Sequence, residues 1–208
     1  ADRVLKPRIS QLASSIDADV ANAYKSISAS VGTPGTTPGT SLVLLQAQQK
    51  LNEQAAGMSP RYATVNPAAN AGLVEGMKGL FNPTDTVSKQ FKNGMMGTGV
   101  LGFDEINMSQ SIKQHTTGSR TNGTVGTTVS TQGQSTIALA GLGASGTITV
   151  GDVFTISGVY AVNPQTREST GSLQQFVVTA ADTASGGGAT TATAIYPAIY
   201  TSAHALAT

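Results

Sequence analysis

The sequence of 208 residues contains no cysteine and few charged residues. Without cysteine, disulfides, thiolate-bound zinc and thiol catalysis are excluded. Only 11% of the residues are charged, and 12 basic against 11 acidic residues give a formal net charge of +1. This balance argues against an electrostatic nucleic-acid binder, which needs clustered Lys and Arg to displace counterions. No apolar run approaches the length that spans a bilayer, and the first residues lack a signal-peptide pattern.

The first segment of the chain has the periodicity of an amphipathic helix. Its apolar residues recur at steps of three or four and therefore fall on one narrow stripe. They are Leu5, Ile9, Leu12, Ile16, Val20, Ala23 and Ile27. Pro7 is either a first-turn residue or the site of a kink, and the Pro- and Gly-rich run 31–40 ends the pattern. Because the chain opens at Ala1 without methionine, we interpret it as a fragment or a processed product.

Shorter helices and strands are predicted up to residue 108. They are a helix over about 42–56, a strand over 62–65, a helix beginning at Asn66-Pro67, a weaker helical stretch over 85–92 and a strand over 103–108. The first of these helices would bury Leu42, Leu45 and Leu51. Asn66 suits the cap of the next helix, and Pro67 fits its first helical position.

From about residue 116 onward, Thr, Gly, Ser and Val dominate the sequence. Apolar positions alternate there between turn signals, which indicates a β-rich domain. The run 147–157 alternates on both sides of Gly151-Asp152, so we predict a hairpin with its turn at these two residues. A last strand is predicted over 192–196. Helices in the first half and strands in the second predict the α+β class.

Two segments, 97–102 and 141–146, match the glycine pattern G-x-G-x-x-G. A dinucleotide site needs a strand before this pattern and a helix after it, whose N-terminal amides receive the pyrophosphate. Strand-like sequence follows both segments, so we interpret them as turns. Asp17 and Asp19 lie two positions apart on the predicted helix and cannot chelate a metal together.

Only His115 and His204 could act as general bases near neutral pH. The order and spacing of the residues around His115 match no catalytic triad, and a triad needs a carboxylate that orients the imidazole. The basic side chains Lys78, Lys89, Lys92, Arg61 and Arg120 are scattered along the sequence. Scattered cations do not support sequence-specific DNA recognition. We therefore predict a protein that is not an enzyme, with no catalytic, cofactor-binding or metal-binding residues and no cofactor.

The run 151–170, GDVFTISGVYAVNPQTREST, is the most distinctive part of the chain. It resembles the inserted β-domain of major coat proteins from short-tailed double-stranded DNA bacteriophages, and the resemblance continues through 172–180. Five shorter segments occur in the order seen in that family. They are 16–20, 31–36, 65–69, 73–81 and 102–104. Together these segments cover nearly the whole chain.

The resemblance implies the tailed-phage major capsid fold with an inserted telokin-like β-domain. Residues 1–32 would form the spine helix, 33–117 the axial domain and 118–208 the inserted β-domain. Family members extend beyond both ends of this sequence, so the N-terminal arm, the extended loop and the returning strands are missing here. We therefore expect this chain to be folded and mostly monomeric in dilute solution.

The resemblance also implies a function and partners. The complete protein would be a structural capsid subunit that self-assembles, with a scaffolding protein, into the icosahedral shell enclosing phage double-stranded DNA. Its partners would be other copies of itself, scaffolding and portal proteins, and packaged DNA held non-specifically, with no membrane. It would be located in the virion capsid, after assembly in the bacterial host cytoplasm. The predicted subunit-interface residues are Arg8, Asp17, Asp19 and Lys25.

A second interpretation is a receptor- or carbohydrate-binding β-domain on a helical stalk, as on a virion surface. The Thr- and Gly-rich second half permits it. An exposed aromatic cluster of Tyr160, Tyr196 and Tyr200 would favour it. An enzyme that depends on His115 is the third interpretation.

Overall fold

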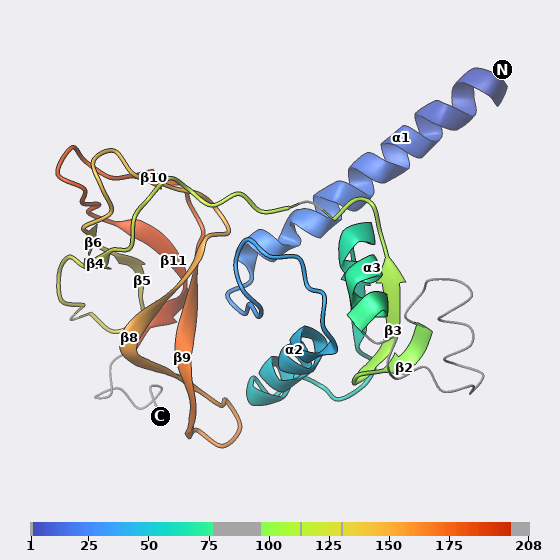
Figure 1. Cartoon of the computed structure of the whole chain (residues 1–208). Coiled ribbons are helices and arrows are strands. Elements are labelled where there is room, and N and C mark those ends of the chain that lie inside the picture. Colours follow the sequence, from blue (N-terminus) through green and yellow to red (C-terminus); the bar gives the residue numbers. More distant parts are fainter. Residues whose placement is uncertain (1, 77–96, 113, 130, 201–208) are drawn as a thin grey trace. The chain divides into compact units, whose positions relative to one another are not determined.

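The computed structural model describes residues 2–76, 97–112, 114–129 and 131–200, and it combines helices with several small sheets (Figure 1). The predicted α+β class is confirmed. The chain divides into two compact units. Unit 1 comprises Ala1–Asn22 and Val31–Gln114, and unit 2 comprises Ala23–Ser30 and His115–Thr208. The division into spine, axial and inserted domains stays a prediction.

Unit 1 combines helices with a small mixed sheet. Its described elements are α1 (Asp2–Ala21), α2 (Ser41–Glu53), β1 (Tyr62–Val65), α3 (Pro67–Gly76), β2 (Gly97–Val100) and β3 (Phe103–Met108). In the sheet, β3 lies between β1, which is parallel to it, and β2, which is antiparallel. Leu44, Leu73, Phe103 and Ile106 form the core of this unit.

The predicted apolar stripe lies on α1 and faces solvent. Its five large residues are between 54% and 68% exposed. They are Leu5, Ile9, Leu12, Ile16 and Val20. The helix includes Pro7 and ends at Ala21, and the 3-10 helix η1 (Asn22–Ser26) follows. Ala23 and Ile27 therefore lie beyond α1, and the prediction that they continue the stripe was wrong.

The buried face of α2 differs from the predicted one. Leu44 is buried, whereas Leu42 and Leu45 remain 59% and 43% exposed. Leu44 packs in the core with the half-buried Ala47 and Leu51, which lie three and seven positions further on and share its face of the helix. The leucines of α2 lie on two overlapping faces of the helix. Tertiary packing buries the face that contains Leu44 and leaves Leu42 and Leu45 exposed.

The predicted start of α3 and both short strands are confirmed. Asn66 caps α3, because its Oδ1 accepts a hydrogen bond of 2.7 Å from the Ala69 N–H, and Pro67 is the first helical residue. β1 and β3 have the predicted bounds. The helical stretch predicted over 85–92 lies outside the described residues.

Unit 2 is built of short and long antiparallel strands. Its described strands are β4 (Thr124–Val125), β5 (Gln134–Ile137), β6 (Leu139–Ala140), β7 (Thr147–Ile148), β8 (Val153–Val162), β9 (Ser169–Val178), β10 (Asp182–Thr183) and β11 (Thr193–Ile199). A four-stranded sheet has the order β5-β11-β9-β8, while β7 pairs with β10 and β4 with β6. Its core contains Ile137, Leu142, Ile148, Phe176 and Val178.

The predicted hairpin around Gly151-Asp152 was wrong in its pairing. β7 pairs with β10, and β8 pairs with β9 in the long hairpin of Figure 1. The chain does turn at these residues, and Gly151 has the positive φ of 94° that glycine tolerates best. However, the turn carries the chain from one sheet to another. At this turn, the side chain of Asp152 is held by groups far away in sequence.

Candidate functional site

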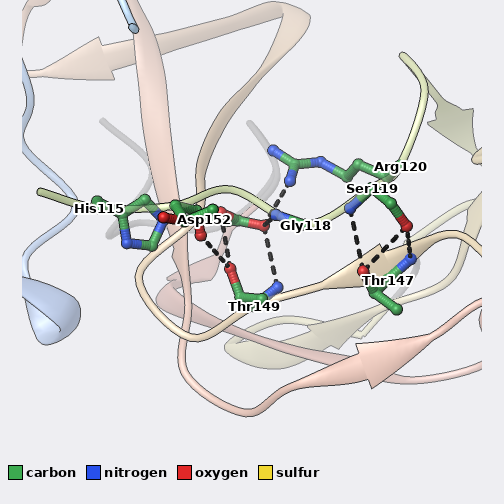
Figure 2. Close-up of polar contacts among 8 residues, drawn as sticks. His115, Gly118, Ser119, Arg120, Thr147, Thr149 and Asp152 are labelled. Atoms are coloured by element: carbon green, nitrogen blue, oxygen red, sulfur yellow. Dashed lines mark hydrogen bonds and ion pairs between the residues drawn. The ribbon is translucent and has the colours of Figure 1, made fainter.

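A polar network in unit 2 surrounds the carboxylate of Asp152, whose side chain is 0% exposed (Figure 2). Its Oδ1 lies 2.8 Å from His115 Nε2 and accepts a hydrogen bond of 3.1 Å from Thr149 Oγ1. Its Oδ2 accepts hydrogen bonds from the Thr149 N–H at 3.0 Å and the Gly118 N–H at 3.3 Å. Arg120 Nη1 forms an ion pair with the same Oδ2. The carboxylate is therefore surrounded by donors on every oxygen.

The turn 149–152 positions Asp152 locally. The Asp152 N–H donates to the Thr149 carbonyl at 3.1 Å, and the Asp152 carboxylate accepts a hydrogen bond from the Thr149 N–H. Such short-range bonds from an Asp side chain to nearby backbone are typical of turns. The turn is joined to β9, because the Val178 N–H donates to the Asp152 carbonyl at 2.9 Å. The sheet therefore fixes the site.

The segment 115–120 lies along the strand-like segment 147–149 and completes the site (Figure 2). The Ser119 N–H donates to Thr147 Oγ1 at 3.0 Å, and the Thr147 N–H donates back to Ser119 Oγ at 3.2 Å. Gly118 permits this close approach, since a Cβ there would lie 1.9 Å from the Thr147 carbonyl oxygen. Between these two segments, hydrogen bonds to Ser119 and Thr147 hydroxyls thus take the place of backbone-to-backbone hydrogen bonds.

The electrostatics keep the Asp152 carboxylate ionised near neutral pH. Burial raises its pKa, but several groups lower it by more, so the pKa lies below its ordinary value of 3.8. These groups are the Thr149 N–H, His115, the charge of Arg120 and the Gly118 N–H. Hydrogen bonds and an opposite charge act this way because they favour the charged form.

Tyr24 extends the network on the other side of His115. Its hydroxyl lies 3.0 Å from His115 Nδ1, and the two rings meet edge-to-face with centroids 5.6 Å apart. Burial, and then the negative charge of Asp152, raise the pKa of the Tyr24 phenol. The phenol therefore keeps its proton at neutral pH.

The chain of hydroxyl, imidazole and carboxylate has the order of groups in a catalytic triad. The raised pKa of Tyr24 favours the neutral form of its phenol. The carboxylate is also shared between His115 and Arg120 instead of serving the imidazole alone. This geometry fits a structural tie that holds η1, the segment 115–120 and the turn 149–152 together.

Both arginines that were considered for DNA contact bind within the chain. Arg61 is 6% exposed, and it donates from Nε to the Gly57 carbonyl at 2.7 Å and from Nη2 to the Ala56 carbonyl at 3.0 Å. It thereby satisfies carbonyls just beyond the C-terminus of α2. Arg120 is paired with Asp152. Lys78, Lys89, Lys92 and His204 lie outside the described residues.

The four predicted interface residues do not all share one environment. Arg8 and Asp19 are exposed on α1, and Lys25 is half-buried in η1. Asp17 accepts a hydrogen bond of 3.0 Å from Ser109 Oγ, and hydrogen bonds from Ser111 and Ser109 lower its pKa. Their role in subunit contact stays a prediction.

The second glycine pattern lies in a turn, as predicted, whereas the prediction was wrong for most of the first, in which Gly97–Val100 form a strand. The first spans β2 and the turn into β3, and the second precedes β7; no helix follows either of them in the described chain. Within residues 2–76, 97–112, 114–129 and 131–200, no group of three His, Asp or Glu side chains is placed to hold a metal ion. Within the same ranges, every helix is too short or too polar to cross a membrane.

Half of the Asp152 network had a signal in the sequence. Thr149 and Asp152 lie three positions apart around Gly151, a spacing that suits a turn in which the Asp side chain bonds to nearby backbone. His115 and Arg120 lie 37 and 32 positions from Asp152, so only the fold brings them together.

Comparison with known proteins identifies no family for this chain. No protein-family model and no curated protein matches it.

Proposed function

We propose that this chain is part of a structural capsid subunit with the tailed-phage capsid fold, which assembles with copies of itself into a shell around double-stranded DNA. The proposal starts from the resemblance of residues 151–170 and 172–180 to coat proteins of short-tailed phages. The structural observation that supports it best is the exposed apolar stripe of α1.

This stripe runs along a helix of 20 residues. Five large apolar side chains, each more than half exposed, follow one another from Leu5 to Val20. Isolated apolar residues are common on protein surfaces, but a contiguous apolar patch marks a contact surface. Covering the exposed half of these five side chains would contribute about 4–7 kcal/mol, from ~1.5–3 kcal/mol for full burial of each. Contacts of this size, repeated by symmetry, stabilise a shell although each pair binds modestly.

The polar network of unit 2 supports a mechanical role. In it, Asp152 joins the segment 115–120 to the sheet that contains β9, and His115 links this segment to Tyr24 of η1. A subunit that bears load between neighbours needs such ties between segments that are distant in sequence.

We propose that the subunit is not an enzyme and that its contacts with packaged DNA are weak and non-specific. Scaffolding and portal proteins would be its partners, and the virion capsid its location.

Sedimentation of the complete gene product, co-expressed with its scaffolding protein, tests the proposal. We expect the wild type to form closed shells. Ile9→Asp places a charge within the stripe and should leave unassembled subunits with an unchanged circular dichroism spectrum. Ser14→Asp is the matched control, because Ser14 is exposed and lies on the opposite face of α1. Normal assembly of the Ile9→Asp protein would contradict this role of α1.

For the receptor-binding alternative, two of the three named tyrosines lie far apart. Tyr160 and Tyr196 are 53% and 57% exposed, but they lie opposite positions 173 and 177 of β9. Four residues along a strand separate side chains by ~13 Å. The strands β8 and β11 also lie on opposite sides of β9. The two tyrosines therefore do not form a contiguous binding platform.

A further inference from the structure

A cavity of about 580 Å³ opens in unit 2 between two segments of strand and loop. One wall is formed by residues 120–125 and the other by residues 153–157. Leu139, Leu142, Ile148 and Val178, all buried core residues, form an apolar floor. The volume falls in the range of about 300–1,000 Å³ that is usual for binding sites.

The wall at 153–157 is the free edge of a sheet. β8 is the last strand in the order β5-β11-β9-β8. The Val178 N–H donates to the Asp152 carbonyl at 2.9 Å, and Phe154 lies opposite Phe176 in the same register. In an antiparallel ladder, hydrogen-bonded pairs alternate along the strand. The N–H and C=O groups of Phe154 therefore point towards β9, and those of Val153 and Thr155 point away from it, to the free edge of β8.

The wall at 120–125 ends in a second strand edge, at Thr124–Val125 of β4. Among the strands that the structure describes, β4 pairs only with β6. The Gly126 N–H donates to the Ala138 carbonyl at 2.8 Å, and Thr124 lies opposite Ala140. By the same alternation, the backbone of Val125 points away from β6. Its side chain is 41% exposed.

Main chain as well as side chains must line this cavity. Neighbouring residues of a strand point to opposite faces, so the five consecutive residues 153–157 of β8 cannot all line one cavity with their side chains, and main chain must form part of this wall. Each edge presents N–H and C=O groups that no strand of the described chain pairs. Such edges accept a further strand.

We propose that this cavity binds an extended polypeptide segment as an added strand between β4 and β8. The backbone of the segment would pair with Val125 on one side and with Val153 and Thr155 on the other. Its alternate side chains would be apolar and cover Leu139 and Leu142, while the others face solvent. A small apolar molecule would fill the floor but leave the backbone groups of both walls unpaired, which disfavours it. This inference is independent of the proposed function.

The test uses a capped, fluorescein-labelled peptide of alternating threonine and valine with a terminal lysine pair. Fluorescence anisotropy should show saturable binding to the intact chain. Thr155→Pro removes an outward N–H without removing a bond of the β8–β9 ladder, and it should weaken binding by about tenfold or more. Thr155→Val is the matched control and should bind as the wild type does. The same peptide with N-methylated threonines should bind at least about tenfold more weakly to the wild type, which needs no variant.

Amide hydrogen exchange by NMR locates the bound peptide. Without the peptide, the amides of Val153 and Thr155 should exchange faster than that of Phe154, and the peptide should protect them. Absence of binding at millimolar peptide, equal binding of the N-methylated form, or protection confined to other amides would overturn the proposal. Binding of the dye 1-anilinonaphthalene-8-sulfonate here without peptide binding would also overturn it, and would assign the cavity to small apolar ligands.

Discussion

Replacing Asp152 with Asn tests the energetic role of the polar network. The amide has the size of the carboxylate, but it removes the charge and directs an NH₂ group at groups that are themselves donors. Removing one partner of a buried ion pair costs about 3–5 kcal/mol. Arg120 and His115 are 20% and 24% exposed and can regain water, so the lower end applies. We expect Asp152→Asn to lower the free energy of unfolding of unit 2 by about 3 kcal/mol, roughly a hundredfold in the equilibrium constant.

The loss should depend on pH in a defined direction. The pKa of Asp152 in the folded protein lies below its ordinary value of 3.8. A carboxyl group whose pKa falls on folding stabilises the protein above its unfolded pKa, and this contribution is lost as pH falls through the folded pKa. The difference between wild type and Asp152→Asn should therefore be constant near neutral pH and shrink below about pH 4.

Urea denaturation at pH 7 and along a series down to pH 3, followed by circular dichroism of the β-rich unit, measures both effects. Glu168→Gln is the matched control, because Glu168 is exposed in the same unit and the change is also from acid to amide. It should change stability by less than about 0.5 kcal/mol. If Asp152→Asn costs no more than this control, or if its cost does not shrink in acid, the network does not stabilise unit 2 as described.

Three further substitutions follow from individual contacts. Tyr24→Phe keeps the ring contact with His115 but loses its hydrogen bond, and should cost about 0.5–1.5 kcal/mol in urea denaturation; a neutral result would show that the bond is not formed in solution. Arg61→Met leaves two carbonyls unsatisfied and should cost about 2–3 kcal/mol, whereas a change under about 0.5 kcal/mol would contradict its buried role. Asn66→Ala removes the cap of α3 and should cost about 1 kcal/mol, with faster amide exchange in the first turn; unaltered exchange would refute the cap.

Local sequence signals were sufficient for several elements. The Asn66-Pro67 pair fixed the start of α3, since a cap and a first-turn proline act within three residues. The apolar period predicted α1 up to Val20. The composition of the second half indicated strands, and Asn163-Pro164 stands at the end of β8.

Features that depend on distant residues could not be predicted. The hairpin at Gly151-Asp152 was a sound local prediction, but the pairing of β7 with β10 depends on a strand more than thirty residues further on. The burial of Leu44 instead of Leu42 depends on which side of α2 meets Phe103 and Leu73. The Asp152 network needs three segments to meet, and neither periodicity nor a short motif encodes that.

Electron microscopy of the complete gene product would show whether this chain is part of a shell-forming subunit. We expect closed icosahedral shells in which every copy of α1 has its apolar stripe covered by protein. A product that stays as dispersed subunits in the presence of its scaffolding protein, or particles in which this stripe faces solvent, would contradict it.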